Sequence, residues 1–170
     1  ASGTARITAK ALGSSLTGTI TKAYDGNTDA ILTSSNFDLT GFISGEGASV
    51  TKTAGTYNDK DVADANSASV TLASNDFSAD SGTTLTNYIL PTIASGTASI
   101  TKKALTISGT TTNDKVYDGN TNADVNLGTL SGFVTGETLS TTAVGTFASK
   151  DVGNRTATFV YTLADGTNGL

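Results

Sequence analysis

Oxygen-bearing side chains recur at the same alternate spacing in two stretches of the sequence. They are Asp25, Asn27 and Asp29 in the first stretch and Asp118, Asn120 and Asn122 in the second. A D-x-N-x-D spacing can place carboxylate and amide oxygens around one calcium ion. Neither stretch has the glycine at the sixth position or the glutamate at the twelfth that an EF-hand loop requires. We therefore expect no bound metal, and we keep calcium at these six residues as the alternative.

The same two stretches contain a sequence that favours a tight turn. They read Tyr24-Asp25-Gly26 and Tyr117-Asp118-Gly119. Asp-Gly pairs favour turns because glycine adopts a positive φ without steric cost. The carboxylate can accept backbone N–H bonds from the residues that follow it, and the tyrosine offers an apolar ring with a polar tip. We predict that these six residues are structural, each turn being anchored in the core by its tyrosine.

Lysines and glutamates at matching positions could form a covalent crosslink. Lys22 matches Lys115, and the only two glutamates, Glu46 and Glu137, each end a G-F-x-x-G-E motif. An intramolecular isopeptide bond joins a lysine to an asparagine or aspartate in an apolar pocket, where burial favours a neutral amine and a protonated acid. No asparagine in an apolar setting recurs outside the Asp-Gly-Asn turns. We therefore expect no crosslink.

The residue types that are missing exclude most catalytic chemistry. The sequence has no Cys, His, Met or Trp, which removes thiol nucleophiles, disulfides, the usual general base and the commonest zinc ligands. The carboxylate pairs Asp59 with Asp61 and Asp76 with Asp80 could perform acid–base chemistry. They do not recur, because Ser149 stands at the position that matches Asp59. We expect that the protein is not an enzyme.

Composition indicates a β-rich chain of low charge. Of the 170 residues, 33 are Thr and 18 are Ser, 15% are charged, and the net charge is −5. Threonine is stiff and β-branched, so it suits the pleated surface of a strand. The few Lys and Arg residues argue against a nucleic-acid partner, and no apolar run is long enough for a membrane helix.

The sequence contains an internal repeat that covers nearly the whole chain. Residues 1–30 and 94–123 are identical at 20 of 30 positions, GFISGE at 41–46 matches GFVTGE at 132–137, and AGTYNDKDV at 54–62 matches VGTFASKDV at 144–152. A period near 93 residues fits a complete small domain and is too long for a solenoid repeat. We predict two domains, residues 1–97 and residues 98–170. The second lacks a counterpart of Asn87-Tyr88-Ile89-Leu90 and should have an exposed edge.

Strands are indicated by alternating apolar and polar residues. The alternation covers residues 5–11, 50–57, 68–72, 98–104 and 157–162, and turn signals separate these stretches. No stretch of helical length has apolar residues at helical spacing. The expected fold class is all-β, with two tandem small β-sandwich-like domains, immunoglobulin-like or a related two-layer form, and negligible helix.

The ordered motifs resemble those of a known family. K-x-Y-D-G-N-T-x-A, G-F-x-x-G-E, G-T-[YF]-x-x-K-D-V, N-Y-x-L and A-x-I-T-K-K-A-L-T together look like the YDG repeat. That repeat occurs in tandem in large bacterial surface proteins, particularly filamentous-haemagglutinin-like adhesins exported by two-partner secretion. The resemblance implies an extracellular module and supplies no catalytic or ligand-binding residues.

The expected function is therefore mechanical. The resemblance and the tandem repeats imply a stalk or spacer in a secreted cell-surface adhesin, which projects a distal binding domain. The expected partners are neighbouring repeats and a host or matrix glycan or protein, and we expect this chain to be a monomer. The alternative is a calcium-dependent or glycan-binding module that contacts host or biofilm polysaccharide directly.

Overall fold

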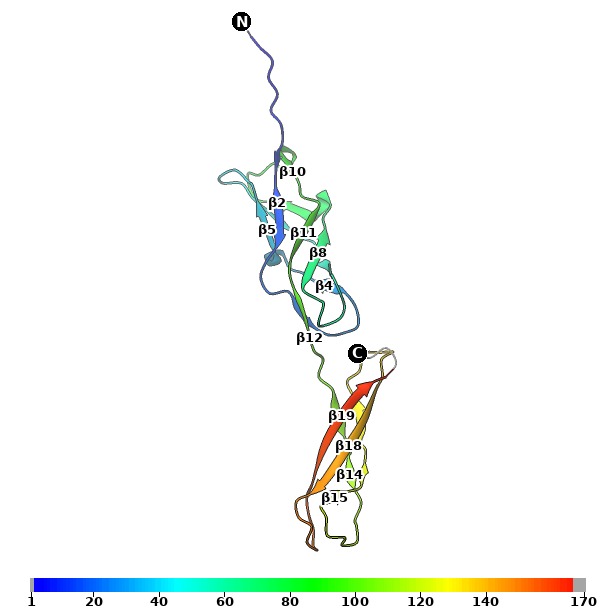
Figure 1. Ribbon diagram of the computed structural model, residues 1–170. Coiled ribbons are helices and arrows are strands. Elements are labelled where there is room, and N and C mark those ends of the chain that lie inside the picture. Colours follow the sequence, from blue (N-terminus) through cyan, green and yellow to red (C-terminus); the bar gives the residue numbers. More distant parts are fainter. Residues whose placement is uncertain (1, 167–170) are drawn as a thin grey trace. The chain divides into compact units, whose positions relative to one another are not determined.

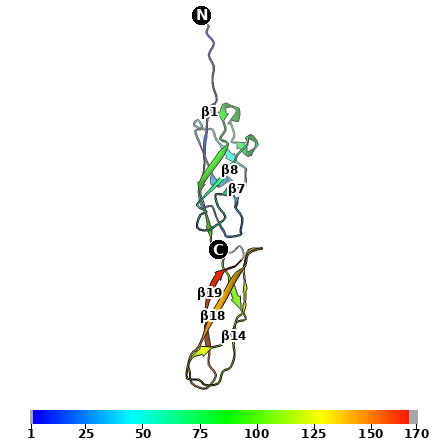
Figure 2. The same cartoon turned by 45° about the vertical axis from the view of Figure 1, so that its right-hand side comes forward.

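The computed structural model describes residues 2–166, and the chain divides into two units. Unit 1 ends at Lys102 and unit 2 begins at Lys103. Strands dominate both units, and the only helical segments among the described residues are three 3-10 turns of three residues each (Figures 1 and 2). The predicted all-β class is confirmed. No helix within the described residues is long and apolar enough to cross a membrane.

The largest sheet of unit 1 has four antiparallel strands. Their order is β11 (Ile93–Thr97), β8 (Ser67–Thr71), β7 (Ala54–Tyr57) and β4 (Asp29–Ile31). In β8 the alternation predicted from the sequence places Ala68 and Val70 in the core, at 1% and 4% exposure. Side chains of successive strand residues point to opposite faces, so the serines and threonines between them lie on the wetter side.

Four two-stranded pairs complete unit 1. Two are antiparallel: β2 (Gly13–Leu16) with β5 (Phe37–Thr40), and β6 (Ala48–Val50) with β9 (Phe77–Ala79). Two are parallel: β1 (Lys10–Ala11) with β10 (Tyr88–Ile89), and β3 (Thr21–Ala23) with β12 (Ser99–Thr101). Both parallel pairs join the beginning of the unit to its end, so the unit is closed by strands that are distant in sequence.

Short 3-10 turns precede two strands that begin with a phenylalanine, and both phenylalanines pack in or against the core. In η1 (Ser34–Asn36) the Asn36 side chain accepts the Thr33 N–H at 2.9 Å, and in η2 (Ser74–Asp76) the Asp76 carboxylate accepts the Ala73 N–H at 2.8 Å. Each turn is followed directly by a strand that begins with phenylalanine. A third turn, η3 (Leu85–Asn87), precedes β10. These local hydrogen bonds satisfy backbone N–H groups of the turns, which have no partner in a neighbouring strand.

Strand β11 connects the large sheet to the β2–β5 pair. It pairs with β8 along one edge, while the Ser14 hydroxyl donates a hydrogen bond to the Ile93 carbonyl at 2.7 Å. Gly96 lies so close to the Leu16 carbonyl that a Cβ would clash with it. A glycine is therefore required at this point of β11, because only a residue without a side chain permits that approach.

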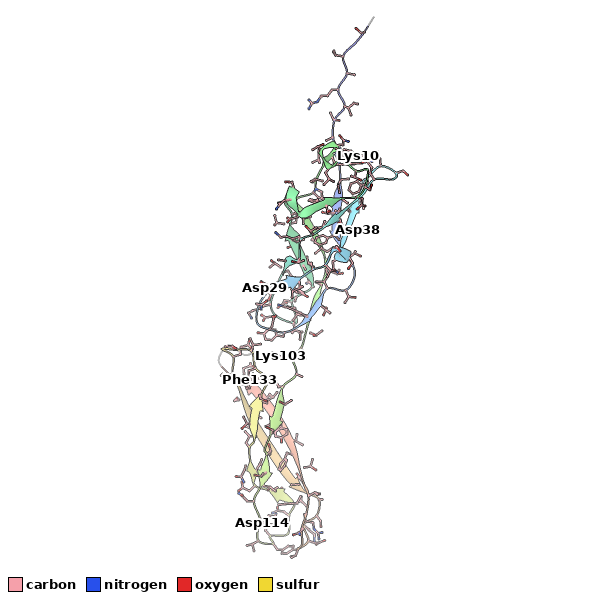
Figure 3. The ribbon with its side chains drawn as sticks, turned by 180° about the vertical axis from the view of Figure 1, so that it is seen from behind. Lys10, Asp29, Asp38, Lys103, Asp114 and Phe133 are labelled. Atoms are coloured by element: carbon pink, nitrogen blue, oxygen red, sulfur yellow. The ribbon has the colours of Figure 1, made fainter. Side chains whose placement is uncertain are left out.

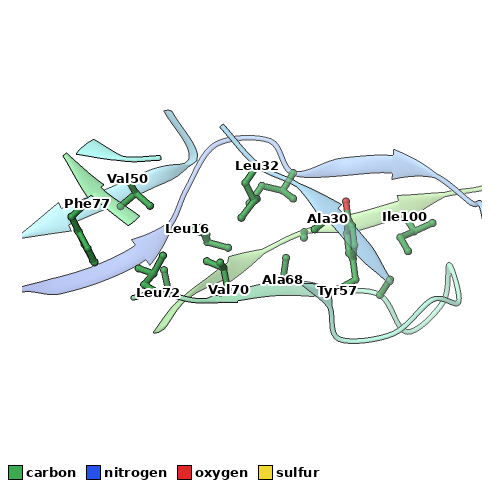
Figure 4. Packing of buried hydrophobic residues seen from close by; sticks show 14 residues of the cluster. Leu16, Ala30, Leu32, Val50, Tyr57, Ala68, Val70, Leu72, Phe77 and Ile100 are labelled. Atoms are coloured by element: carbon green, nitrogen blue, oxygen red, sulfur yellow. The ribbon is translucent and has the colours of Figure 1, made fainter. Parts of the chain in front are cut away.

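All of the buried apolar side chains of the described chain belong to unit 1. Leu32 and Val50 are almost fully enclosed, at 1% and 0% exposure, and no polar or charged residue is buried among the described residues. Figure 4 shows these side chains gathered between the strands, with Leu16, Val70 and Leu72 facing one another. The burial of this cluster is the main source of stability for unit 1.

The described part of unit 2 contains fewer sheets than unit 1. Its strands are β13 (Thr106–Ser108) with β17 (Thr129–Ser131), β14 (Thr111–Thr112) with β16 (Val125–Asn126), and a three-stranded sheet in the order β15 (Asn122–Ala123), β18 (Leu139–Phe147), β19 (Ala157–Asp165). The β13–β17 pair is the counterpart of β2–β5, because residues at matching positions of the repeat lie opposite one another in both pairs. The three-stranded sheet is the counterpart of β4, β7 and β8. The described part of unit 2 has no counterpart of β11 or β12, and its only fully buried residue is Gly145.

The first predicted strand differs from the structure. Residues 5–9 alternate but form no strand, and only Lys10–Ala11 pairs in that stretch. The matching residues Ser99–Thr101 do form a strand, which pairs within unit 1. Alternation therefore identified a sequence able to form a strand, but a strand also needs a partner, and residues 5–9 have none among the described residues.

We predict that Leu32→Ala lowers the free energy of unfolding of unit 1 by about 2–5 kcal/mol, the usual cost of truncating a buried leucine. Ile31→Ala is the matched control, because the neighbouring Ile31 is 89% exposed and its loss should cost less than about 0.5 kcal/mol. Urea unfolding followed by circular dichroism measures both. Equal effects of the two substitutions would contradict the assigned core.

Candidate functional site

The Tyr-Asp-Gly turn of unit 1 is organised around the ammonium group of Lys22. The Lys22 Nζ lies 2.7 Å from Asp25 Oδ1, and it donates hydrogen bonds to the Asn27 carbonyl at 2.9 Å and to Asn27 Oδ1 at 2.8 Å. Three oxygens therefore surround one cation. Lys22 belongs to β3, so the strand itself positions the ammonium at the start of the turn.

Side-chain oxygens also hold the backbone of this turn. Asp25 Oδ1 accepts the Asn27 N–H at 3.2 Å, and Asn27 Oδ1 accepts the Asp29 N–H at 2.8 Å. Gly26 has a φ of 81°, the left-handed conformation that favours glycine. Strand β4 begins at Asp29. The turn therefore directs the chain from β3 into the large sheet.

Unit 2 repeats this arrangement atom for atom. The Lys115 Nζ lies 2.9 Å from Asp118 Oδ1, from the Asn120 carbonyl and from Asn120 Oδ1. Asp118 and Asn120 accept the N–H groups two residues further on, and Gly119 has a φ of 78°. The same contacts therefore hold the turn in both units.

Each central lysine also lies over an aromatic ring. Lys22 Nζ is 5.4 Å from the centre of the Tyr57 ring, and Lys115 Nζ is 5.8 Å from the centre of the Phe147 ring. A cation at this distance is attracted by the negative face of the ring. The lysine of the K-x-Y-D-G-N motif is thus bound to the aromatic residue of the G-T-[YF] motif, a link that the sequence analysis missed.

In each unit the lysine favours the charged form of its own aspartate. Partial desolvation raises the pKa of Asp25, but the hydrogen bonds from Lys22 and from the Asn27 N–H outweigh it and leave the pKa below its ordinary value. The hydrogen bond from Lys115 lowers the pKa of Asp118, with the Asn120 N–H adding to it. Hydrogen bonds to the ionised form favour that form.

Four of the six residues kept as alternative calcium ligands are therefore engaged with an ammonium group. Oxygens of Asp25 and Asn27, like those of Asp118 and Asn120, face the lysine, whereas Asp29 and Asn122 contribute backbone N–H groups (Figure 3 labels Asp29). Within the described residues no three acidic side chains gather as a metal site. Calcium would have to displace the lysine from these oxygens. The absence of a metal and of a crosslink both remain predictions.

The two motif tyrosines differ in burial. Tyr24 packs against the core of unit 1, whereas Tyr117 is 58% exposed. The expectation that both rings are buried anchors is therefore not met at Tyr117. The backbone contacts differ as well: in unit 1 the Tyr24 N–H donates to the Thr101 carbonyl of β12 at 2.8 Å, and the described part of unit 2 has no such strand.

The glutamate of the G-F-x-x-G-E motif has a role that the sequence analysis did not predict. The Tyr88 hydroxyl donates to Glu46 Oε2 at 2.5 Å and accepts the Ile43 N–H at 3.3 Å, while the rings of Phe42 and Tyr88 meet edge to face at 5.0 Å. The hydrogen bond to Glu46 raises the pKa of Tyr88, with desolvation adding to it. The motif thus fixes the N-Y-x-L strand, which lies more than 40 residues away in sequence.

In each carboxylate pair one member, Asp59 or Asp76, accepts a backbone N–H. Asp59 accepts the Asp61 N–H at 2.9 Å, and Ser149 accepts the Asp151 N–H at 3.1 Å at the matching place in unit 2. A hydroxyl can therefore replace the Asp59 carboxylate in this turn. Asp76 caps η2, as described above, and that the protein is not an enzyme remains a prediction.

The chain belongs to the YDG domain family. The model of the YDG domain matches residues 8–97 and again residues 101–169. The predicted resemblance is thus confirmed for the domain itself, in two copies. No curated protein and no solved structure matches the chain.

We predict that Asp25→Asn destabilises unit 1 at pH 7 and that the loss disappears in acid. The native pKa of Asp25 lies below its ordinary value of 3.8, so the ionised group stabilises the fold above that pH. This contribution is lost as the pH falls through the native pKa. Urea unfolding at pH 7 and at about pH 3 should show the difference from wild type shrinking towards zero.

Asp29→Asn is the control, because Asn122 already stands at the matching place and Asp29 makes no ion pair among the described residues. It should cost less than Asp25→Asn at pH 7. A loss for Asp25→Asn that is the same at both pH values would contradict the ion pair.

Proposed function

We propose that the two YDG domains are spacer repeats of a bacterial surface adhesin of the filamentous-haemagglutinin-like kind, exported by two-partner secretion, and that they hold a distal binding domain away from the cell. Tandem copies of one domain extend a chain without requiring a new fold for each step. Support comes from the two successive family matches and from turns built on local contacts within each copy. The partners of such repeats are their neighbours in the chain.

The observation that carries this proposal is the pairing of the terminal strands of unit 1. β1 pairs in parallel with β10, and β12 pairs in parallel with β3. Tension along the chain pulls β1 and β12 along their own axes. Their hydrogen bonds to the neighbouring strands are then loaded together in shear, whereas a hairpin pulled from its open end loses its bonds one at a time. This geometry suits a domain that carries load.

Single-molecule stretching of the full chain between terminal handles tests the proposal. We predict that unit 1 unfolds in one step that releases roughly 300 Å of chain, because about 90 residues extend by about 3.5 Å each. Ile100→Asp, placed on the buried face of β12, should lower the unfolding force. Ile31→Asp, on the exposed face of β4, is the matched control and should leave the force unchanged.

Gradual extension of the wild-type chain without a distinct force peak would contradict a spacer under load. Binding of the unmodified chain to an array of glycans, with or without calcium, would favour the alternative of an adhesion module that contacts polysaccharide directly.

A further inference from the structure

The Asp-Gly pairs of the two turns, Asp25-Gly26 and Asp118-Gly119, are places where a protein backbone can rearrange chemically. The glycine nitrogen attacks the aspartate Cγ, because glycine has no side chain to hinder the approach. The protonated carboxyl group loses one oxygen and the nitrogen loses its proton, so one water leaves and a cyclic imide, a succinimide, forms. Water then opens the ring at either carbonyl carbon. Opening at the former backbone carbonyl gives isoaspartate.

The reacting groups are accessible in both turns. Within residues 2–166 the N–H groups of Gly26 and Gly119 donate no hydrogen bond. A Cβ built at Gly119 would meet no atom within 4 Å. The side chains of Asp25 and Asp118 are 44% and 47% exposed. Burial of the aspartate therefore protects neither pair.

The aspartate carboxylates are held by a charged donor and a backbone donor. Asp25 Oδ1 lies 2.7 Å from Lys22 Nζ and accepts the Asn27 N–H at 3.2 Å. The corresponding distances in unit 2 are 2.9 Å and 3.1 Å. Hydrogen bonds between ionised groups are stronger than those between neutral groups. Ring closure consumes the negative charge that the ammonium binds, so each ion pair stabilises the aspartate and not the imide.

The ionisation of the carboxyl groups acts in the same direction. The ring closes from the protonated acid, because water leaves more readily than an oxide ion. The pKa values of Asp25 and Asp118 both lie below the ordinary value of aspartate. The protonated form is therefore scarcer in each turn at neutral pH than it is in an unstructured chain.

We propose that Lys22 and Lys115 protect the Asp-Gly pairs of the two YDG turns from isomerisation to isoaspartate. In both units the lysine stands three residues before the aspartate and holds its carboxylate in the charged, unreactive form. The arrangement is the same in the two turns although Lys22 and Lys115 differ in burial, with side chains 18% and 26% exposed. The protection therefore comes from the ion pair.

The third Asp-Gly pair of the sequence lacks this arrangement. Thr162 stands three residues before Asp165 in Asp165-Gly166. Among the described residues Asp165 forms no ion pair. This pair is therefore a reference within the same chain, at which substitution of either turn lysine should have no effect.

Isomerisation would change the backbone between two strands. Isoaspartate carries the main chain through Cβ and Cγ, which adds one carbon to the backbone and leaves a carboxylate on Cα. In unit 1 that carbon would lie between β3 and β4, whose registers with β12 and β7 are fixed by their ladders. The protection therefore preserves the fold of the domain over time. It does not depend on the role of the domain as a spacer.

Prolonged incubation of the full chain at neutral pH, followed by digestion and mass spectrometry, tests the proposal. Electron-transfer fragmentation distinguishes isoaspartate from aspartate, which has the same mass. Lys22→Met keeps a long side chain and removes the charge. Isoaspartate at Asp25 should then form about tenfold faster than in the wild type, because a hydrogen bond between charged groups no longer has to break. The rates at Asp118 and Asp165 should not change.

Lys115→Met is the reciprocal variant. It should raise the rate at Asp118 by about the same factor and leave Asp25 and Asp165 unchanged. An unchanged rate at the aspartate of the substituted turn, in either variant, would overturn the proposal. A slower rate there would also overturn it, because it would show that the ammonium donates a proton to the leaving oxygen and promotes ring closure.

A control separates the ion pair from general loss of stability. Val50 is 0% exposed and belongs to β6, outside the turn. Val50→Ala removes buried apolar atoms and so destabilises unit 1, but it leaves Lys22 in place. It should form isoaspartate at Asp25 at the wild-type rate, and urea unfolding compares its stability with that of Lys22→Met. A rise in Val50→Ala as large as that in Lys22→Met would overturn the proposal.

Discussion

Unit 1 holds together because a strand from its end lies beside a strand from its beginning. β12 covers the core at Ile100, and β11 before it joins the four-stranded sheet to the β2–β5 pair. A domain of about 90 residues has little apolar surface to bury, so leaving one edge uncovered exposes much of its core. The described part of unit 2, which has no counterpart of β11 or β12, illustrates this constraint, since Tyr117 and four of its valines are exposed: Val116, Val144, Val152 and Val160.

The Tyr-Asp-Gly turn is stable by different means. Its lysine binds one carboxylate and two oxygens of one asparagine, and it lies over an aromatic ring. These contacts span few residues, apart from the ring, and they form in both units although the units differ in burial. An ammonium carried by the chain thus fills the position that the residue spacing suggested for a metal ion.

The sequence predicted local features well and distant contacts poorly. Alternation identified β8 and β19, and Asp-Gly identified both turns, because these signals act between neighbouring residues. The hydrogen bond of Tyr88 with Glu46 and the position of Lys22 over Tyr57 were missed, since each joins motifs that are separated by a loop of unknown path. Residues 5–9 show the limit most clearly: their sequence matches a strand of unit 1, but whether they form one depends on a partner.

Hydrogen exchange of single backbone amides tests the central claim that the closing strand β12 completes unit 1, whereas the described part of unit 2 has no such strand. We predict slow exchange of the Tyr24 amide, which donates to Thr101, and exchange of the Tyr117 amide close to that of an unstructured peptide, because protection reports the opening of a hydrogen-bonded structure. Equal protection of the Tyr24 and Tyr117 amides would contradict the account.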